Sequence, residues 1–485
     1  MPHSDSEAKA PLPASVEVTP GGPVEGFIRP PGSKSLTNRA LICAAFADGR
    51  SELTGALQSE DTKVMIDALR SIGVGIDVSH GGKKLVVDGQ VVGRQTGPGS
   101  VDASDLQQLY VANSGTTVRF LAAALSAAGG HYRLVGVDRM HQRPIGDLVE
   151  ALQMVVDGGI EAVSPNGCPP VEIQSRGWKK NKLDVGGSVS SQYLSGLMMA
   201  APLVGAKHGH AEIGNKTKPV KQRTTDILVA GELVSRPYVD MTANVMRSFG
   251  ATLTLTDGDL SSGPSLMVEV EGGGYSPTPY EIEPDASAAS YFWAAAAITG
   301  GEVTVGGLSR HAMQGDVGFC DVLEKMGCQV EYAGDFIRVE GRPLRGIDID
   351  MNEISDTVQT LAVVALFASS PTRVRGVAHN RFKETDRIGD LARELRKLDA
   401  IVEEHEDGLT IHPIHSDHVA RADRKVVLET YHDHRMAMSL ALAGLRISGV
   451  QILNPACTGK TYPEFFADLE SLIGRSHQWV TSADQ

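Results

Sequence analysis

The sequence contains no long apolar run: none of its segments approaches the ~18 consecutive apolar residues that a transmembrane helix needs. The opening stretch, "MPHSDSEAKAPLPASVE", is polar, and it lacks both the apolar core of a secretory signal and an Arg-rich amphipathic pattern. We therefore expect a cytoplasmic protein with no membrane partner, in which residues 1–14 form a disordered extension.

Cysteine and basic charge are also scarce. The five cysteines, at positions 43, 168, 320, 328 and 457, show no metal-ligand spacing, and their odd number suits a reducing compartment. The 45 basic against 59 acidic residues give a net charge of −14, which argues against a nucleic-acid partner because such a binder presents a basic face. With 485 residues, 41% hydrophobic and 21% charged, the chain is expected to be globular, with several domains or one repetitive architecture.

A nucleotide-binding P-loop is absent, although "RPPGSKSLTNRA" (29–40) places a Gly, a Lys and two Ser ahead of an apolar run. The pattern GxxxxGK[ST] fails because Gly26 lies one residue too far upstream, and Pro30 and Pro31 remove two N–H donors. An anion site at a helix start is still expected here, because free N–H groups and the helix dipole attract negative charge.

A weak internal repeat runs through the chain. Apolar runs rich in small residues recur at roughly 70–100-residue intervals, each followed by a short β-branched stretch, a second amphipathic helix and a new strand. The runs are "ALICAAFA" (40–47), "FLAAALSA" (120–127), "YLSGLMMA" (193–200), "YFWAAAAI" (291–298), "LAVVALFA" (361–368) and "MAMSLALA" (436–443). This pattern predicts six helix–strand–helix–strand units, with the first helix buried and the sheet outside.

A Gly- and Pro-rich break at 272–287 separates the third unit from the fourth. The strand expected in "SVEVTPGGPVEGFIR" (15–29) matches no unit of the first half, so it could complete the second half. The chain would then cross twice between halves, near 31–33 and near 283–285, and form a hinge.

Polar residues precede several of the buried helices. In "NSGTTVR" (113–119) and "SSQYLSG" (190–196) they could be ordinary helix caps or an anion site. Arg139 and Arg143 precede a helix that Pro144 is predicted to start, and a solvated basic loop is the alternative. The pair His432 and His434 has no third ligand nearby, so no metal site is expected.

The stretch "HNRFKETDRIGDLARELRKL" favours function over a structural role. The spacing of Lys383, Glu384 and Arg387 predicts two cations on one face of a helix near its start. Cations there oppose the helix dipole, and a bound anion would offset that cost. Asp356 begins another buried helix, where it could serve as a cap or in catalysis.

The cations at helix starts stand out in this acidic chain, and they imply a substrate, or a pair of substrates, that carries several negative charges. We expect them to converge on one cleft; they are Lys34, Arg39, Arg143, Lys383, Arg387, Arg435 and Lys460.

Eight motifs, in order over residues 16–474, resemble the 5-enolpyruvylshikimate-3-phosphate synthase (3-phosphoshikimate 1-carboxyvinyltransferase) family. They are "PGSKSLTNRAL", "NSGTTVR", "RPIGDLVEAL", "SSQYLSG", "LVSRPYVD", "KETDRI", "HDHRMAMS" and "CTGKTYPEFF". The resemblance implies a two-domain inside-out α/β barrel of six βαβαββ repeats, three per domain, with buried helices and outer sheets. Residues 1–32 plus 284–485 would form domain I and residues 33–283 domain II, with a double hinge near 31–33 and 283–285.

The resemblance also implies a reaction: enolpyruvyl transfer from phosphoenolpyruvate to the 5-hydroxyl of shikimate 3-phosphate, by addition and elimination, with no cofactor and no metal. A monomer that binds these two small molecules is expected. The implied catalytic residues are Asp356, Glu384 and Lys34. The implied contacts of shikimate 3-phosphate are Lys34, Ser35, Arg39, Ser190, Ser191, Gln192, Ser235, Tyr238, Asp356, His379 and Lys383. Those of phosphoenolpyruvate are Lys34, Gly115, Arg143, Gln192, Arg387, Arg435 and Lys460.

Two positions depart from the family pattern. Phe120 stands where many members have Pro, which bears on sensitivity to glyphosate-type analogues. His379, followed by Asn380, stands where the family often has Asn, so either of the two could contact substrate.

Three alternatives are open. A sister enolpyruvyl transferase that acts on UDP-N-acetylglucosamine uses a Cys on a mobile loop, and "DRMHQRPIG" contains none. A relative that binds RNA 3′ ends is disfavoured by the acidic charge. An inactive relative would have lost Lys34, Asp356 or Glu384, and all three are present.

Overall fold

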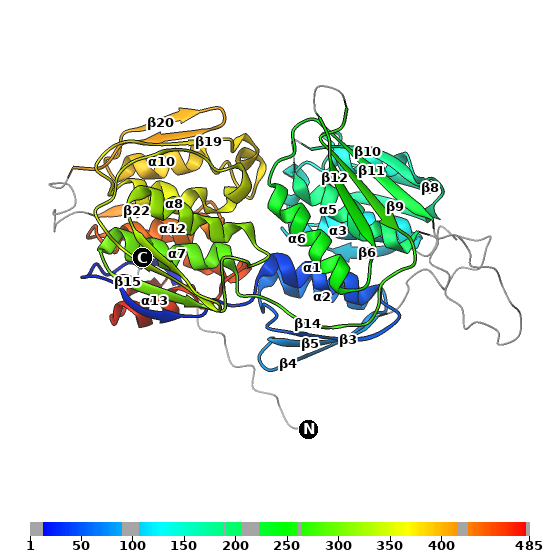
Figure 1. The fold of residues 1–485 in the computed structure, drawn as a ribbon, viewed down its shortest axis with the longest axis horizontal. Coiled ribbons are helices and arrows are strands. Elements are labelled where there is room, and N and C mark those ends of the chain that lie inside the picture. Colours follow the sequence, from blue (N-terminus) through cyan, green and yellow to red (C-terminus); the bar gives the residue numbers. More distant parts are fainter. Residues whose placement is uncertain are drawn as a thin grey trace, which may run out of the picture.

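The computed structural model describes residues 13–89, 106–187, 190–204, 223–259, 263–415 and 425–481. The predicted extension falls mainly on residues 1–12, which lie outside the described residues, while residues 13 and 14 already belong to a strand. The chain forms two lobes, in which helices pack on the inside and sheets on the outside (Figure 1).

The first lobe consists of three units of the same kind. Their elements are β14 (Pro279–Glu281), α1 (Lys34–Ala45), β3 (Gly49–Thr54), α2 (Glu60–Ser71), β4 (Gly75–Ser79) and β5 (Lys84–Gly89); β6 (Gln107–Tyr110), α3 (Gly115–Ala128), β7 (Gly130–Val135), α4 (Gly146–Gln153), β8 (Val156–Ala162) and β9 (Val171–Trp178); and β10 (Lys182–Gly186), α5 (Ser191–Ala200), β11 (Thr224–Ala230), α6 (Arg236–Ser248), β12 (Leu253–Asp257) and β13 (Leu266–Glu271).

The second lobe repeats the plan. Its elements are β2 (Glu25–Ile28), α7 (Ala286–Thr299), β15 (Glu302–Gly306), α8 (Phe319–Met326), β16 (Gln329–Tyr332) and β17 (Phe336–Glu340); β18 (Asp348–Asp350), α9 (Val358–Ala365), β19 (Thr372–Arg375), α10 (Gly389–Lys397), β20 (Val402–His405) and β21 (Gly408–Ile411); and β22 (Val426–Leu428), α12 (His434–Ala443), β23 (Val450–Leu453), α13 (Phe465–Ile473), β24 (Gln478–Thr481) and β1 (Pro13–Glu17).

The described strands form six four-stranded sheets with one topology. In the sheet β18-β19-β21-β20, for example, the first pair is parallel and the other two pairs are antiparallel. A parallel pair needs a crossover, and in four of the six units the buried helix (α3, α5, α9 or α12) supplies it. In the other two units the parallel partner, β14 or β2, comes from a distant part of the chain. The predicted inside-out α/β fold with six βαβαββ repeats is confirmed.

The N-terminal segment 15–29 is two strands rather than the single strand that was predicted. Strand β1 inserts between β23 and β24, and β2 pairs with β15 in a different sheet. Both complete the second lobe, as the sequence indicated. Strand β14 completes the first lobe in the same way: it lies directly before α7, the first helix of the second lobe, yet it pairs with β3 of the first lobe.

The two crossing segments meet between the lobes. The Ser33 amide donates to the Glu283 carbonyl at 2.8 Å, and the Asp285 amide donates to the Pro31 carbonyl at 2.8 Å. Gly32 fits because an added Cβ would lie 1.8 Å from the Gly55 carbonyl oxygen. The crossing is therefore a short, hydrogen-bonded double strand.

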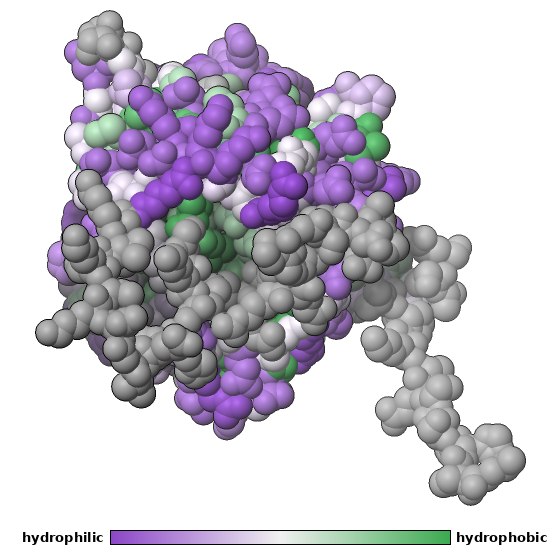
Figure 2. Space-filling model, turned by 90° about the vertical axis from the view of Figure 1, so that its right-hand side faces the viewer, coloured by the Kyte–Doolittle hydropathy of each residue, from purple (hydrophilic) through white to green (hydrophobic). Residues whose placement is uncertain are grey.

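Buried apolar side chains form two separate clusters, one within residues 36–282 and one from residues 16–24 and 286–469. The first helix of each unit is buried almost all round, and its small residues allow close packing: a Cβ on Gly196 of α5 would lie 3.1 Å from the Arg119 carbonyl of α3. The outer face of the first lobe is mainly hydrophilic where described residues reach it (Figure 2). Among the described residues, no helix has the length and apolar character to span a membrane.

Substitution of Trp293 in α7 can test whether the two apolar clusters are independent. Its side chain is fully buried, so Trp293→Ala should cost about 3–5 kcal/mol of unfolding free energy. Hydrogen exchange should speed up within 286–469 and stay unchanged within 36–282. Trp479→Ala, at a half-exposed position, is the matched control and should cost less than about 1 kcal/mol. Equal loss of protection in both clusters would contradict two separate cores.

Candidate active site

Arg387 is the centre of a buried ion network in the second lobe. Its guanidinium is 2% exposed and donates to Asp433 through Nε at 2.7 Å and through Nη2 at 3.2 Å. The same group donates to Asp356 at 3.1 Å and to Glu384 at 2.8 Å. One cation thus holds three carboxylates that come from separate segments of the chain.

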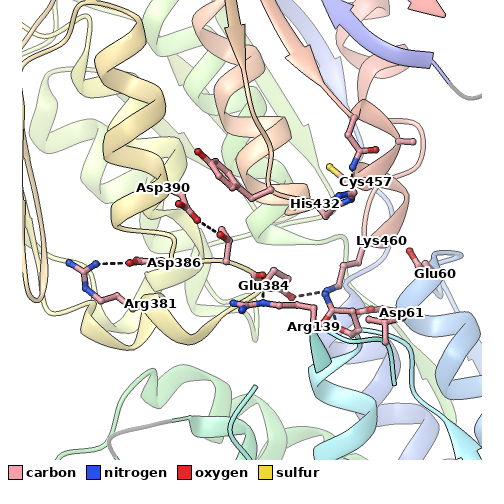
Figure 3. Close-up of a pocket in the computed structure, with 16 residues that line it drawn as sticks. Glu60, Asp61, Arg139, Arg381, Glu384, Asp386, Asp390, His432, Cys457 and Lys460 are labelled. Atoms are coloured by element: carbon pink, nitrogen blue, oxygen red, sulfur yellow. Dashed lines mark hydrogen bonds and ion pairs between the residues drawn. The ribbon is translucent and has the colours of Figure 1, made fainter. Parts of the chain in front are cut away.

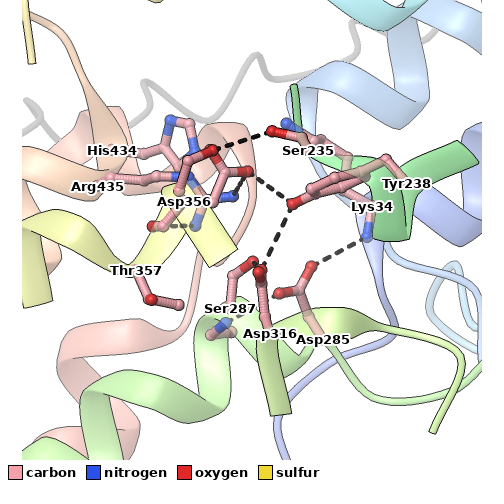
Figure 4. Close-up of polar contacts among 12 residues, drawn as sticks. Lys34, Ser235, Tyr238, Asp285, Ser287, Asp316, Asp356, Thr357, His434 and Arg435 are labelled. Atoms are coloured by element: carbon pink, nitrogen blue, oxygen red, sulfur yellow. Dashed lines mark hydrogen bonds and ion pairs between the residues drawn. The ribbon is translucent and has the colours of Figure 1, made fainter. Parts of the chain in front are cut away.

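Asp356 lies in the 3₁₀ turn η5 (Asn352–Thr357), directly before α9. It does not cap α9, because Thr357 occupies the cap position, so the structural alternative for this residue is wrong. Arg435 donates to its Oδ2 at 2.7 Å and the Tyr238 hydroxyl donates at 2.9 Å (Figure 4). Burial disfavours its charge, but Arg435, Lys383 and Arg387 together hold the pKa of Asp356 well below its usual range.

Glu384 borders a pocket of about 880 Å³ that both lobes line (Figure 3). Lys460 donates to its Oε1 at 2.8 Å, and Arg143 of the first lobe approaches the same oxygen at 3.8 Å. Burial opposes ionisation here too, yet Lys460, Arg387 and Arg143 hold the pKa of Glu384 well below its usual range. The carboxylate is therefore charged and surrounded by cations.

Ser235 and Tyr238, at the start of α6, reach across to the second lobe. The Ser235 hydroxyl lies 3.3 Å from Ser355 Oγ and 3.4 Å from His379 Nε2. Burial and the charge of Lys383 lower the pKa of His379 to about 3, so this imidazole is neutral at physiological pH. Asn380 instead donates to the Ser355 carbonyl at 2.9 Å.

Lys383 lies beside this group. Burial, helped by the charge of Arg387, lowers its pKa to about 8, although Asp356 acts in the opposite direction. At neutral pH the ammonium therefore remains mostly protonated, and it loses charge in mildly alkaline solution.

Lys34 begins α1, where its amide lies 3.3 Å from Asp285 Oδ2 and its Nζ lies 3.5 Å from Asp61. Arg39, one turn later, is buried, and its guanidinium donates hydrogen bonds to residues of the first lobe. It donates to Thr242 at 2.7 Å and to the Ser35 carbonyl at 2.9 Å, and its guanidinium lies over the Phe120 ring. Phe120 thus packs against a residue that is predicted to bind substrate.

Arg143 donates to the Asn113 carbonyl at 2.9 Å. Gly115 leaves room for it, because a Cβ there would lie 2.7 Å from Arg143 Nη2. Gln192 is held by Arg119, which donates to its Oε1 at 2.7 Å. The Nε atoms of Arg119 and Arg143 are both buried without an acceptor among the described residues, as expected of an anion-binding surface.

Ser190 and Ser191 lie at the start of α5, and Ser35 lies at the start of α1. The Ser190 hydroxyl accepts from the Gln192 amide at 3.3 Å, so it does cap its helix. All three lie at the N-terminal end of a helix, where the helix dipole favours an anion.

Two details of the sequence interpretation are wrong. Residues 383–388 form a loop rather than the start of a helix, because Asp386 accepts from the amides of Ile388 and Gly389 and α10 begins only at Gly389. Helix α4 begins at Gly146, because the Pro144 carbonyl accepts hydrogen bonds from Arg119 and Tyr193 and lies outside the helix. Arg143, Lys383 and Arg387 are therefore oriented by loops.

Sequence reasoning missed Asp433 and Arg119, although both stand in the quoted motifs "HDHRMAMS" and "NSGTTVR". Asp433 caps α12 by accepting from the Arg435 amide at 2.8 Å. A helix cap explains an Asp at this position, so nothing in the sequence indicated that it also binds Arg387. Among the described residues no group of three or more His, Cys, Asp or Glu is placed to hold a metal ion.

Asp316 was also missed. It lies in the turn η4 (Gly315–Gly318), accepts from Ser287, and lies 3.4 Å from the Tyr238 hydroxyl (Figure 4). Burial and the neighbouring charge of Asp356 raise its pKa to about 7, with Asp285 adding to the rise and Arg435 opposing it.

The two-lobed fold is that of the enolpyruvyl transferases. A solved EPSP synthase from Acinetobacter baumannii matches with a TM-score of 0.72 and 25% identity over 96% of this chain and 98% of that one. The enolpyruvyl transferase NikO from Streptomyces tendae has a TM-score of 0.70 at 18% identity, over 96% and 99% of the two chains.

Sequence comparison is more specific. The EPSP synthase (3-phosphoshikimate 1-carboxyvinyltransferase) family matches residues 18–469. Proteins named 3-phosphoshikimate 1-carboxyvinyltransferase from Colwellia psychrerythraea and Yersinia ruckeri are 40% and 41% identical, over 93% and 94% of this chain and 98% of each relative. The chain belongs to the EPSP synthase family. It is a transferase of the shikimate pathway, and its reaction is enolpyruvyl transfer from phosphoenolpyruvate to shikimate 3-phosphate.

The raised pKa of Asp316 predicts a pH-dependent stability. The neutral carboxyl stabilises the fold fully below the unfolded pKa near 3.8, and this contribution is lost as pH rises toward 7. Asp316→Asn does not titrate, so its unfolding free energy relative to the unsubstituted protein should increase by on the order of 2 kcal/mol between pH 5 and pH 8. Urea unfolding at each pH measures this, with the exposed Asp48→Asn as control. A difference that does not change with pH would refute it.

Proposed function

We propose that the transfer proceeds at the interface of the lobes by addition and elimination through a tetrahedral intermediate. Asp356 takes the proton of the 5-hydroxyl, and Glu384 exchanges a proton with the methylene carbon of phosphoenolpyruvate. Lys34 and the arginines balance the charge that develops on the phosphate as it leaves.

Lys34 contacts both substrates, and each of the other cations contacts one of them. Shikimate 3-phosphate is held by Lys34, Ser35, Arg39, Ser190, Ser191, Gln192, Ser235, Tyr238, Asp356, His379 and Lys383. Phosphoenolpyruvate is held by Lys34, Gly115, Arg143, Gln192, Arg387, Arg435 and Lys460. The unpaired Nε of Arg143 supports its part in this set, while the internal bonds of Arg39 favour a mainly orienting role.

The observation that carries this proposal is that Asp356 and Glu384 each accept hydrogen bonds from cations that are assigned to phosphoenolpyruvate. Arg435 and Arg387 donate to Asp356, and Lys460 and Arg387 donate to Glu384. These cations hold the pKa of both carboxyls well below the usual range. A carboxylate with so low a pKa is a weak base, and it carries no proton that it could donate. When substrate phosphate and carboxylate groups engage Arg143, Arg387 and Lys460, they cancel part of that positive field. The pKa of each carboxyl then rises toward the range in which it can exchange protons.

We further propose that the two apolar clusters are the cores of two domains, residues 1–32 plus 284–485 and residues 33–283. The paired segments around Gly32 and Pro284 support a double hinge at their boundary. Closure about this hinge excludes water from the reacting groups. The acidic net charge and the two small substrates support a cytoplasmic monomer that needs no macromolecular partner.

Phosphate release tests the catalytic assignment. The purified protein should release phosphate from phosphoenolpyruvate only when shikimate 3-phosphate is present. Asp356→Ala should lower kcat by about 100-fold or more, in line with the loss of a general base. Release by Asp356→Ala equal to that of the unsubstituted protein would overturn the role of Asp356.

Glu384→Gln gives a separate readout. It keeps the shape of the side chain but cannot exchange a proton, so incorporation of solvent deuterium into the methylene of phosphoenolpyruvate should fall by about 100-fold or more together with kcat. Unchanged incorporation would assign the proton exchange to another group.

A further inference from the structure

Arg139 lies in the loop before α4, outside every set of substrate contacts named above. Its Nε donates to the Glu384 carbonyl at 2.9 Å (Figure 3), and its Nη2 donates to the Lys383 carbonyl at 3.2 Å. Its Nη1 donates to Gln142 at 3.1 Å within its own loop. A first-lobe side chain thus binds two consecutive carbonyls of the second lobe.

The position of these carbonyls gives the contact its importance. Lys383 has φ −88° and ψ −150°, and the loop that it begins runs to α10 at Gly389. No helix fixes this backbone. The planar fork of a guanidinium has two donors with a set direction and spacing, so it can fix the orientation of both the 383–384 and the 384–385 peptides. These two peptides flank the Cα from which the Glu384 side chain leaves the backbone.

Two of the cations that contact the Glu384 carboxylate itself also link the lobes. Lys460 donates both to Glu384 and, at 3.1 Å, to the Asn113 carbonyl, and Arg143 approaches the Glu384 carboxylate directly. Both cations are assigned to phosphoenolpyruvate. Among the described residues, Arg139 bonds only to backbone and Gln142, and each of its three nitrogens has an acceptor, so it is placed to orient rather than to bind substrate.

We propose that Arg139 is a positioning residue that brings the Lys383–Glu384 peptide into its reactive orientation only when the lobes are together. The inference rests on the proposed role of Glu384 in proton exchange. It links closure to chemistry, because the donor comes from one lobe and the catalytic acid from the other.

Substitution of Arg139 should affect catalysis more than binding. In Arg139→Ala, kcat should fall about 10- to 100-fold, while the KM for shikimate 3-phosphate should stay within about threefold. Deuterium incorporation into the methylene of phosphoenolpyruvate should fall in parallel with kcat, because it reports on Glu384. Arg139→Lys should recover only part of kcat, since an ammonium lacks the planar fork.

Arg133→Ala is the matched control, because it removes an arginine from the same lobe that pairs with Glu172 at a half-exposed site. It should leave kcat and exchange unchanged. Thermal unfolding of all variants shows whether they are folded; if Arg139→Ala is not, Arg139→Lys and Arg139→Gln provide the test.

The outcomes separate the two ideas. Arg139→Ala with kcat within twofold of the unsubstituted protein overturns the inference. So does a fall in kcat without a fall in deuterium incorporation, or a loss that appears mainly in the KM of either substrate. If Glu384→Gln keeps full incorporation, the role of Glu384 fails instead, whatever the Arg139 variants do.

Discussion

The structure of the site depends on the buried guanidinium of Arg387 and its three carboxylate partners. Desolvating a cation costs several kcal/mol, and the bonds to Asp433, Asp356 and Glu384 offset that cost only while all of them are kept. Because these partners come from a helix cap, a 3₁₀ turn and a loop, the ion network also fixes those three segments relative to one another. Removal of one carboxylate partner leaves part of the buried charge of Arg387 uncompensated. It also removes the contact that fixes the segment carrying that carboxylate.

The same network makes the site responsive to anions. Asp356 and Glu384 are charged because cations surround them, and those cations are the groups that phosphate and carboxylate ligands attract. Under the proposed assignment of these residues, substrate binding and proton transfer are linked through one set of charges. The contacts between lobes belong to the same set: Tyr238 reaches Asp356, and Lys460 joins Glu384 to the Asn113 carbonyl. The arrangement of the lobes and the protonation of the carboxyls depend on each other.

The six units, the buried helices and the completion of the second lobe by the N-terminal segment were predictable, because helical and strand periods are local properties of a sequence. The split of residues 15–29 into β1 and β2 was not, since each strand is defined by partners far along the chain. The prediction of a helix at Lys383 was wrong, because the Asp386 side chain accepts hydrogen bonds from the Ile388 and Gly389 amides and α10 begins only at Gly389. Asp433 and Arg119 were overlooked because a cap and a helix interior explain them locally, and only tertiary contacts give them their second role. The predicted roles of the site residues stay predictions.

The insertion of β1 between β23 and β24 has a consequence for biosynthesis. Ser15 pairs with Leu453 and with Val480, so β1 must wait until β23 and β24 have been synthesised about 440 residues later. At typical translation rates this takes roughly 20–90 s. The cluster formed by residues 36–282 has all its strands early and can fold during that time. Until their partner strands are made, the edges of β1 and β2 are unpaired and open to pairing with other chains.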